Sequence, residues 1–308
     1  MTKHPTSEQL EITQGLCQSP AKISPKYFYD TNGSALFEEI TRLQAYYPTR
    51  TEAAIMARHA QEIAGSIGAN RMLIELGAGN CQKAKVLCEL INPTHFVAVD
   101  ISEAFLQEAV AAMRLAFPHI RIEAIASDLT AEVVLPASLP AQGRLVFYPG
   151  SSIGNFDPPH ALALLSRMRG LLQDDGAMLI GVDLVKNQTV LNAAYDDDAG
   201  VTAAFNLNIL NHVNRLIGSN FDTAQWLHRA FFNPEQLRIE MHLQAKTDLL
   251  VRWTGGTRRF DAGERIHTEN SYKYRIEDFV ALLTRAGFSQ TQVWTDDQDW
   301  FAVVLAKP

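Results

Sequence analysis

The sequence predicts an α/β fold in which a doubly wound parallel sheet carries an inserted α+β domain. Between residues 51 and 184, short apolar segments alternate with amphipathic segments of helical period. This alternation stops over residues 185–274 and returns from residue 275 to the end of the sequence. With 308 residues, of which 47% are hydrophobic, the chain can form two domains with buried cores.

Helices and strands are expected to alternate through residues 51–184. The strand candidates are short and apolar, and amphipathic segments lie between them, which is typical of a parallel sheet covered by helices. Helices are expected at 51–67, 82–90, 102–117 and 160–172, and strands at 71–79, 95–100, 121–129, 143–150 and 177–185.

The end of the chain is expected to rejoin this sheet. Residues 276–287 predict a helix, and the apolar runs 289–296 and 299–307 predict a hairpin because an acidic turn separates them. We therefore assign residues 51–184 and 275–308 to one α/β domain.

Residues 26–50 and 185–274 are assigned to a second, α+β domain, and residues 1–25 to an N-terminal arm. Residues 202–218 predict a long helix, and 238–246 and 248–254 predict strands. A further helix contains Leu36, Phe37, Ile40 and Leu43, and Pro48 is expected to end it. Four tyrosines near it, Tyr27, Tyr29, Tyr46 and Tyr47, suit core packing and a pocket wall about equally well.

Composition narrows the classes of function. The 27 Lys and Arg and 34 Asp and Glu give a net charge of 27 − 34 = −7, which does not favour binding to nucleic acid. We expect a cytoplasmic protein, because there is neither an apolar run long enough to span a membrane nor a secretory signal. The cysteines, Cys17, Cys81 and Cys88, form no CxxC pair and no disulfide framework.

The first predicted strand ends in the motif Gly77-Ala78-Gly79, where glycines allow backbone N–H groups to approach a ligand closely. A dinucleotide-binding loop requires a third glycine, and Gln82 stands at that position. The motif therefore favours a nucleoside that carries an amino-acid tail over one that carries a pyrophosphate.

Acidic residues close the next two predicted strands. Asp100 is placed to accept hydrogen bonds from the hydroxyl groups of a ribose, and Asp128 to accept one from the amine of an adenine. Each could be a solvated residue at a strand end, but acids at successive carboxyl ends of one sheet favour a nucleoside site. With the C-terminal hairpin, the sheet resembles the Rossmann-like, seven-stranded sheet of S-adenosylmethionine-dependent methyltransferases.

One motif is set aside. Asp157-Pro158-Pro159-His160 resembles the acid-Pro-Pro-aromatic tetrad of enzymes that methylate amino groups in DNA, but His160 replaces the aromatic residue. We interpret it as a helix start, with Asp157 as the N-cap and the prolines in the first turn.

Two further segments are candidates for a substrate site. The loop 148–156 is rich in small residues and contains Asn155, whose amide both donates and accepts hydrogen bonds. The segment 266–274 reads as a strand in which Glu269 and Ser271, two residues apart, lie on one face. Such a pair is usually a solvated strand face.

Over residues 26–308 the chain resembles the histidine-specific Nα-methyltransferases of ergothioneine biosynthesis, which use S-adenosylmethionine. Long, ordered segments carry this resemblance, which makes it far more specific than the glycine motif alone. They are residues 26–52, 75–83, 127–129, 147–156, 193–210, 238–243, 267–274 and 292–306.

The resemblance implies a two-domain enzyme that transfers three methyl groups to the α-amine of L-histidine, giving hercynine without a metal. We also expect a monomer. The family's methyl-donor residues fall on Tyr29, Gly77, Lys83, Asp100, Asp128 and Leu129, with Tyr29 also assigned a catalytic role. Its substrate residues fall on Asn155 and Tyr195 for the carboxylate, and on Glu269 and Ser271 for the imidazole, with Tyr46 nearby.

Hydrogen bonding agrees with histidine as the substrate. A neutral imidazole has one donor and one acceptor nitrogen, which the carboxylate of Glu269 and the hydroxyl of Ser271 would satisfy together. An indole offers only a donor and would leave the serine unmatched. Methylation of another aromatic amino acid such as tryptophan, and donor binding without turnover, are the alternatives.

Overall fold

The computed structural model describes residues 5–69, 71–129, 131 and 133–308. The chain divides into two compact units. Unit 1 consists of Met1–Tyr46 and Asn187–Ser271, and unit 2 consists of Tyr47–Lys186 and Tyr272–Pro308.

Unit 2 contains a seven-stranded sheet in the order β12-β13-β6-β5-β2-β3-β4. Pairing from β6 through to β4 is parallel, β13 is antiparallel to β6, and β12 and β13 form an antiparallel hairpin. The predicted sheet and its C-terminal hairpin are therefore confirmed. The strands are β2 (Met72–Leu76), β3 (His95–Asp100), β4 (Arg121–Ala126), β5 (Arg144–Tyr148), β6 (Ala177–Asp183), β12 (Gln290–Thr295) and β13 (Phe301–Lys307).

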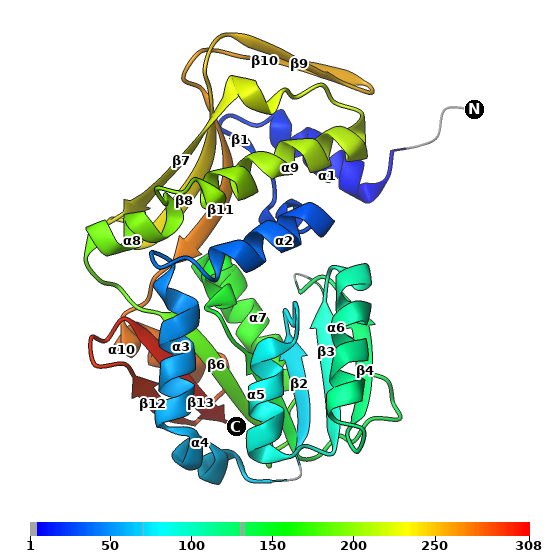
Figure 1. Ribbon diagram of the computed structural model, residues 1–308, viewed down its shortest axis with the longest axis vertical. Coiled ribbons are helices and arrows are strands. Elements are labelled where there is room, and N and C mark those ends of the chain that lie inside the picture. Colours follow the sequence, from blue (N-terminus) through cyan, green and yellow to red (C-terminus); the bar gives the residue numbers. More distant parts are fainter. Residues whose placement is uncertain (1–4, 70, 130, 132) are drawn as a thin grey trace. The chain divides into compact units, whose positions relative to one another are not determined.

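Helices cover both faces of this sheet (Figure 1). Every residue of β2 and β6 is buried, because apolar side chains from the two faces enter two separate cores. One core includes residues of α5 and α6, and the other includes residues of α7 and α10. The helices of unit 2 are α3 (Tyr47–Arg58), α4 (Ala60–Ile67), α5 (Gln82–Ile91), α6 (Glu103–Ala116), α7 (Pro158–Gly170) and α10 (Ile276–Arg285).

Two expected helix boundaries were wrong. Pro48 does not end a helix but lies in the first turn of α3, where a proline is tolerated because its missing N–H would have no helical partner. The single helix expected over 51–67 is divided at His59, whose backbone is not helical. The start of α7 is as predicted, since Asp157 accepts from the His160 N–H at 3.0 Å.

Unit 1 combines helices with a four-stranded sheet in the order β1-β11-β8-β7 and a separate hairpin of β9 and β10. The segment expected as an arm contributes α1, and it contributes β1, which pairs in parallel with β11. The elements are α1 (Ser7–Leu16), β1 (Ala21–Lys22), η1 (Pro25–Phe28), α2 (Thr31–Ile40), α8 (Gln188–Tyr195), α9 (Val201–Ile217), η3 (Thr223–Gln225), β7 (Trp226–Asn233), β8 (Arg238–Ala245), β9 (Leu249–Trp253), β10 (Gly256–Phe260) and β11 (Arg265–Tyr272).

The long helix α9 fixes the strand β11 in unit 1. Asn206 of α9 accepts a hydrogen bond from the Thr268 hydroxyl at 2.8 Å and donates to the carbonyl of His242 in β8 at 3.0 Å. Because the bond to Thr268 is buried, it holds β11, the strand that carries Glu269 and Ser271, in a defined register against the helix.

Candidate functional site

The loop after β2 and the end of β3 form the first part of the site, in unit 2. The Gly77 and Ala78 N–H groups both donate to the carbonyl of Val99, and the Gly79 N–H donates to Asp100 Oδ2 at 2.9 Å. Gly79 has a φ of +51°, and a side chain there would meet nothing within 4 Å. The left-handed backbone, rather than crowding, is therefore what favours glycine at this position.

Asp100 is held by backbone donors on both carboxylate oxygens. Besides the bond from Gly79, Oδ1 accepts from the Ser102 N–H at 2.9 Å. The Ser127 N–H donates to the Asp100 carbonyl at 2.9 Å, so β4 ends beside β3, and Asp128 and Leu129 follow at once. The structure thus brings Gly77, Asp100 and Asp128 to one edge of the sheet.

Lys83 lies in the first turn of α5 and is paired with a buried acid on α3. Its Nζ lies 2.6 Å from Glu52 Oε2, and the other Glu52 oxygen accepts from the Gly150 N–H at 2.9 Å. Glu52 therefore connects a predicted donor residue to the loop that carries Asn155. Sequence reasoning did not single out Glu52, because a Glu in an amphipathic helix is usually solvated.

Glu75, inside β2, is a second acid that sequence reasoning missed. Its side chain is 1% exposed, and Oε2 has no hydrogen-bond partner among the described residues. Burial raises the pKa of Glu75 well above its ordinary value, and the charges of Asp100 and Glu52 raise it further, although Lys83 opposes them. The only sequence signal is an acid within an otherwise apolar strand.

Replacing Glu75 with glutamine is expected to raise the melting temperature more at pH 7.5 than at pH 5. The folded protein keeps a proton on Glu75 that the unfolded chain loses above pH 4.5, so stability falls as the pH rises above that value. Each kcal/mol recovered corresponds to about 2–4 °C. Calorimetry of Glu75→Gln, with Glu108→Gln on the exposed face of α6 as control, checks this. An equal change at both pH values would show that Glu75 is ionised.

Asn155 ends the short helix η2 (Ser152–Asn155) in the loop after β5. Ser151, the residue before η2, has a φ of +60°, and its Oγ accepts a hydrogen bond from the Asp183 N–H at 2.9 Å. This bond attaches the loop to the end of β6, so the position of Asn155 depends on a buried contact.

Aromatic rings form a connected cluster in unit 1. Tyr46 lies edge-on to Tyr195, with ring centroids 6.1 Å apart, and it also contacts Phe37 at 6.4 Å. Phe37 and Phe205 in turn contact the ring of Tyr29 at 5.9 Å each. Three predicted site residues therefore belong to one cluster. Tyr27 and Tyr47, at 2% and 0% exposure, are buried more deeply than Tyr46 and Tyr195, at 9% and 8%.

Glu269 and Ser271 lie on β11, and Ser271 contacts this cluster. The Ser271 hydroxyl lies 2.8 Å from the Tyr195 hydroxyl. Glu269 is 7% exposed and Ser271 4%, so the pair is not a solvated strand face. Of the predicted residues, unit 1 contains Tyr29, Tyr46, Tyr195, Glu269 and Ser271, and unit 2 contains Gly77, Lys83, Asp100, Asp128, Leu129 and Asn155.

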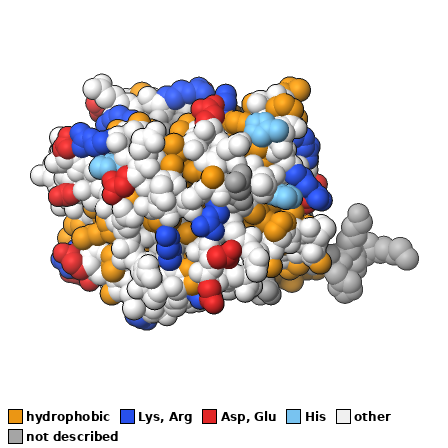
Figure 2. Space-filling view, turned by 90° about the horizontal axis from the view of Figure 1, so that it is seen from below, with side chains coloured by type: hydrophobic (Ala, Val, Ile, Leu, Met, Phe, Trp, Pro, Cys, Tyr) orange, Lys and Arg blue, Asp and Glu red, His pale blue; other side chains and the backbone are white. Residues whose placement is uncertain are grey.

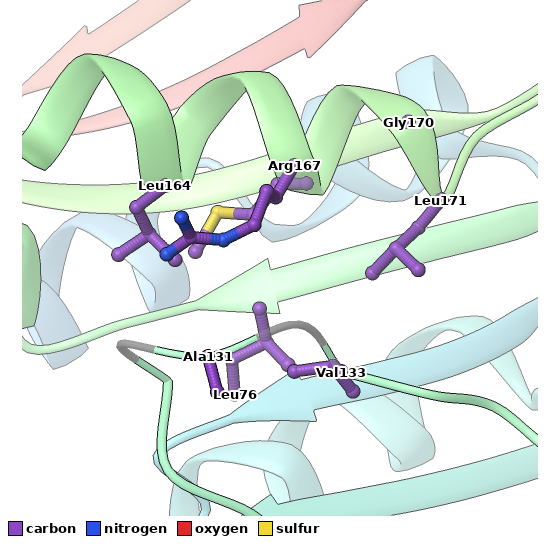
Figure 3. A pocket seen from close by; sticks show the side chains of 8 residues that line it. Leu76, Ala131, Val133, Leu164, Arg167, Gly170 and Leu171 are labelled. Atoms are coloured by element: carbon purple, nitrogen blue, oxygen red, sulfur yellow. The ribbon is translucent and has the colours of Figure 1, made fainter.

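A separate cavity in unit 2 lies between α7 and a segment that includes Ala131 and Val133 (Figure 3). Arg167 of α7 reaches across to the carbonyl of Leu129 at 3.0 Å. The cavity is lined by Leu76, Ala131, Val133, Leu164, Arg167, Met168, Gly170 and Leu171. None of the residues predicted to bind donor or substrate is among these lining residues.

The surface charge, the helix lengths and the metal-binding potential of the described residues can be stated briefly. On the face in view in Figure 2, charged side chains of both signs are interspersed with apolar ones. Within the described part of the chain, no helix is long and apolar enough to cross a membrane. Those same residues contain no group of three or more His, Cys, Asp or Glu that could hold a metal ion.

Comparison with known proteins identifies the family. The sequence model of the family "Histidine-specific methyltransferase, SAM-dependent" matches residues 8–308. The chain belongs to this family. The resemblance inferred from the sequence is thus confirmed, and the methyl donor is S-adenosylmethionine.

Two relatives show how far the similarity extends. The histidine N-alpha-methyltransferase of Mycolicibacterium smegmatis is 41% identical over 303 residues, which cover 96% of this chain and 93% of that protein. The ergothioneine biosynthesis protein 1 of Neurospora crassa is 30% identical over 309 residues, which cover 94% of this chain and 33% of that longer protein.

A solved structure bears on the fold alone. A crystal structure of an S-adenosylmethionine-dependent methyltransferase from Clostridium acetobutylicum matches with a TM-score of 0.51 at 13% identity. The match covers 90% of this methyltransferase and 99% of that chain. It agrees with the seven-stranded sheet described above.

The described residues fit the donor of the family. S-adenosylmethionine carries a sulfonium and an ammonium, and two charged acids, Glu52 and Asp100, lie near the loop after β2 with one lysine, Lys83. Because Glu75 keeps its proton, these three groups leave one negative charge in excess, which favours a cationic ligand. Open space beside Gly79 leaves the loop backbone accessible for close approach.

Proposed function

We propose that this methyltransferase transfers methyl groups from S-adenosylmethionine to the α-amine of L-histidine, three in succession, giving hercynine, the first step of ergothioneine biosynthesis. The match of the histidine-specific family over residues 8–308 carries this proposal. The burial of Glu269 beside Ser271 supports it, because a buried carboxylate and hydroxyl are suited to recognise a polar ring.

The donor is proposed to bind in unit 2. Asp100 accepts hydrogen bonds from the ribose hydroxyls, Asp128 accepts one from the adenine amine, and Leu129 contacts the adenine ring. The backbone of Gly77 lies close to the amino-acid tail of the donor. Glu52 positions Lys83, whose ammonium binds the carboxylate of that tail. Tyr29, which lies in unit 1, is proposed as a further donor contact and as a catalytic residue.

The substrate is proposed to be held at both ends. Asn155 and Tyr195 bind the carboxylate, while Glu269 accepts the imidazole N–H and Ser271 donates to the other ring nitrogen. Tyr46 packs against the ring from the aromatic cluster. The donor supplies an electrophilic methyl group, so the residues of the chain need only align the unprotonated α-amine with it.

The trimethylated product is expected to accumulate when the donor is in excess. Each methylated intermediate keeps the free carboxylate that Asn155 and Tyr195 are proposed to bind, so it can bind again and react. Mass spectrometry of a reaction with histidine and S-adenosylmethionine should show gains corresponding to one, two and finally three methyl groups. Accumulation of monomethylhistidine alone would contradict this, as would higher activity on histidine esters or peptides.

The same assay with all twenty amino acids tests the proposed function. We expect methylation of histidine alone. Methylation of tryptophan in preference to histidine would instead support another aromatic substrate, and S-adenosylhomocysteine binding with no methylated product would indicate a donor-binding protein. The monomeric state, the cytoplasmic location and the absence of nucleic acid and membrane partners stay predictions.

A further inference from the structure

Asp183, at the end of β6, is the centre of a buried polar cluster in unit 2. Its carboxylate is 0% exposed. The Tyr47 hydroxyl lies 2.8 and 2.7 Å from its two oxygens, Lys186 Nζ lies 2.5 Å from Oδ1, and Lys273 Nζ lies 2.7 Å from Oδ2. Lys186 Nζ also donates to the Tyr47 hydroxyl at 2.8 Å.

The three partners of this carboxylate stand where the chain passes between the units. The chain changes unit three times, after Tyr46, after Lys186 and after Ser271. Tyr47 is the first residue of unit 2, Lys186 is the last before unit 1 resumes, and Lys273 is the second after the final crossing. One carboxylate therefore binds a side chain at every crossing.

The residues predicted to bind histidine lie close along the chain to these anchors. Tyr46 directly precedes Tyr47, and Ser271 precedes Lys273 by two positions. The loop that carries Asn155 is attached to the same centre, because Ser151 Oγ accepts the Asp183 N–H at 2.9 Å. Displacing the carboxylate would release the backbone next to Tyr46 and Ser271, whereas the bond to Ser151 is made by the Asp183 backbone and does not depend on the side chain.

We propose that the Asp183 side chain is a positioning group for histidine binding, which fixes the segments that carry Tyr46 and Ser271, while the Asp183 backbone holds the loop that carries Asn155. The proposal rests on the proposed function. Asp183 itself does not touch the substrate in this scheme. It acts through the three anchors, so its loss should weaken histidine binding while the donor residues Gly77, Asp100 and Asp128 keep their own backbone bonds.

The charges in the cluster explain why a carboxylate is required. Two ammonium groups, on Lys186 and Lys273, share one buried carboxylate. Burial would raise the pKa of Asp183, but Lys273 and Lys186 outweigh burial and hold it below its ordinary value. Burial also lowers the pKa of Lys186 to about 8, against the attraction of Asp183 and Asp296 and together with the repulsion of Lys273.

The sharpest test is Tyr47→Phe, which removes one hydroxyl from the cluster and leaves its charges in place. Tyr274→Phe is the matched control, because the Tyr274 hydroxyl is also buried in unit 2 and has no hydrogen-bond partner among the described residues. Steady-state kinetics with histidine and calorimetry with S-adenosylhomocysteine are measured for both. We expect the histidine KM of Tyr47→Phe to rise about five- to tenfold, with kcat and donor Kd within about twofold of wild type.

The other outcomes each overturn the proposal. An unchanged KM with only a lower melting temperature would make the cluster a purely structural one, and an equal rise in KM and donor Kd would indicate general disorder. A rise of the same size in Tyr274→Phe would exclude a specific role for Asp183. A wild-type protein that binds S-adenosylhomocysteine but does not methylate histidine would instead reject the proposed function itself.

Asp183→Asn provides a second measurement on the same proposal. It keeps the shape of the side chain and removes the charge that the two lysines share. We expect a larger rise in histidine KM than for Tyr47→Phe. If Asp183→Asn does not fold, Tyr47→Phe still decides between the outcomes.

Discussion

Replacing Asp100 with alanine is expected to weaken S-adenosylhomocysteine binding by about a hundredfold. The carboxylate accepts N–H bonds from Gly79 and Ser102, and it is proposed to accept the ribose hydroxyls. Each hydrogen bond to a charged group contributes about 1.5–3 kcal/mol, and a loss of about 2.8 kcal/mol corresponds to a hundredfold change. The variant also frees the Gly79 N–H, so the loop after β2 loses its orientation. Titration calorimetry of Asp100→Ala measures the change directly.

Asp157→Ala is the control for this experiment. It removes an acid of unit 2 that also accepts a backbone N–H, but its role is to cap α7. It should lower stability by about 0.5–2 kcal/mol and leave donor affinity unchanged. Wild-type protein should not bind NAD, because Gln82 replaces the third glycine of a dinucleotide loop. Unchanged donor affinity in Asp100→Ala, or tight NAD binding without S-adenosylhomocysteine binding, would contradict the assignment.

Replacing Glu269 with alanine is expected to lower kcat/KM for histidine by about ten- to a hundredfold. A buried carboxylate that accepts the imidazole N–H should contribute about 1.5–3 kcal/mol, and each 1.4 kcal/mol is a factor of ten. Discrimination against tryptophan and phenylalanine should fall as well, because the pocket loses the charge that disfavours apolar rings. Donor affinity should stay close to that of wild type. Steady-state kinetics on histidine and tryptophan measure both effects.

Glu240→Gln is the matched control. Glu240 is the other buried glutamate of unit 1, but its carboxylate is occupied by Arg238, Asn233 and His242. Losing its charge should cost stability and leave the histidine kcat/KM within about twofold. An unchanged kcat/KM in Glu269→Ala would remove Glu269 from the substrate site.

The sequence predicted the sheet of unit 2 well because its signals are local. Apolar runs such as β2 and β6 are buried along their whole length, and the helices between them have one apolar side. The N-terminal helix α1 was not predicted, since only Ile12 and Leu16 of it are buried. Its capping box of Thr6 and Gln9 was the available signal.

The site was predictable only in part. Asp100 is the last residue of a strand, so its place at the sheet edge could be inferred from the strand pattern. Glu52 could not, because its partner Lys83 lies 31 positions away and nothing nearby in sequence marks the contact. The same holds for Asp183 and Tyr47, which are 136 positions apart. Buried ionic contacts of this kind depend on the assembled fold.

The hydrogen bond between Tyr195 and Ser271 has a consequence for preorganisation. It holds the two side chains in fixed rotamers, so little side-chain entropy is lost when a ligand binds and the hydroxyl hydrogens reorient toward it. Each hydroxyl has one hydrogen, and the mutual bond uses one of them. A ligand with a carboxylate and a basic ring nitrogen could accept from both hydroxyls and so compensate for breaking that bond. Phenylalanine has a carboxylate but no ring nitrogen. It would therefore replace the broken bond at one hydroxyl and leave the other hydroxyl without an acceptor.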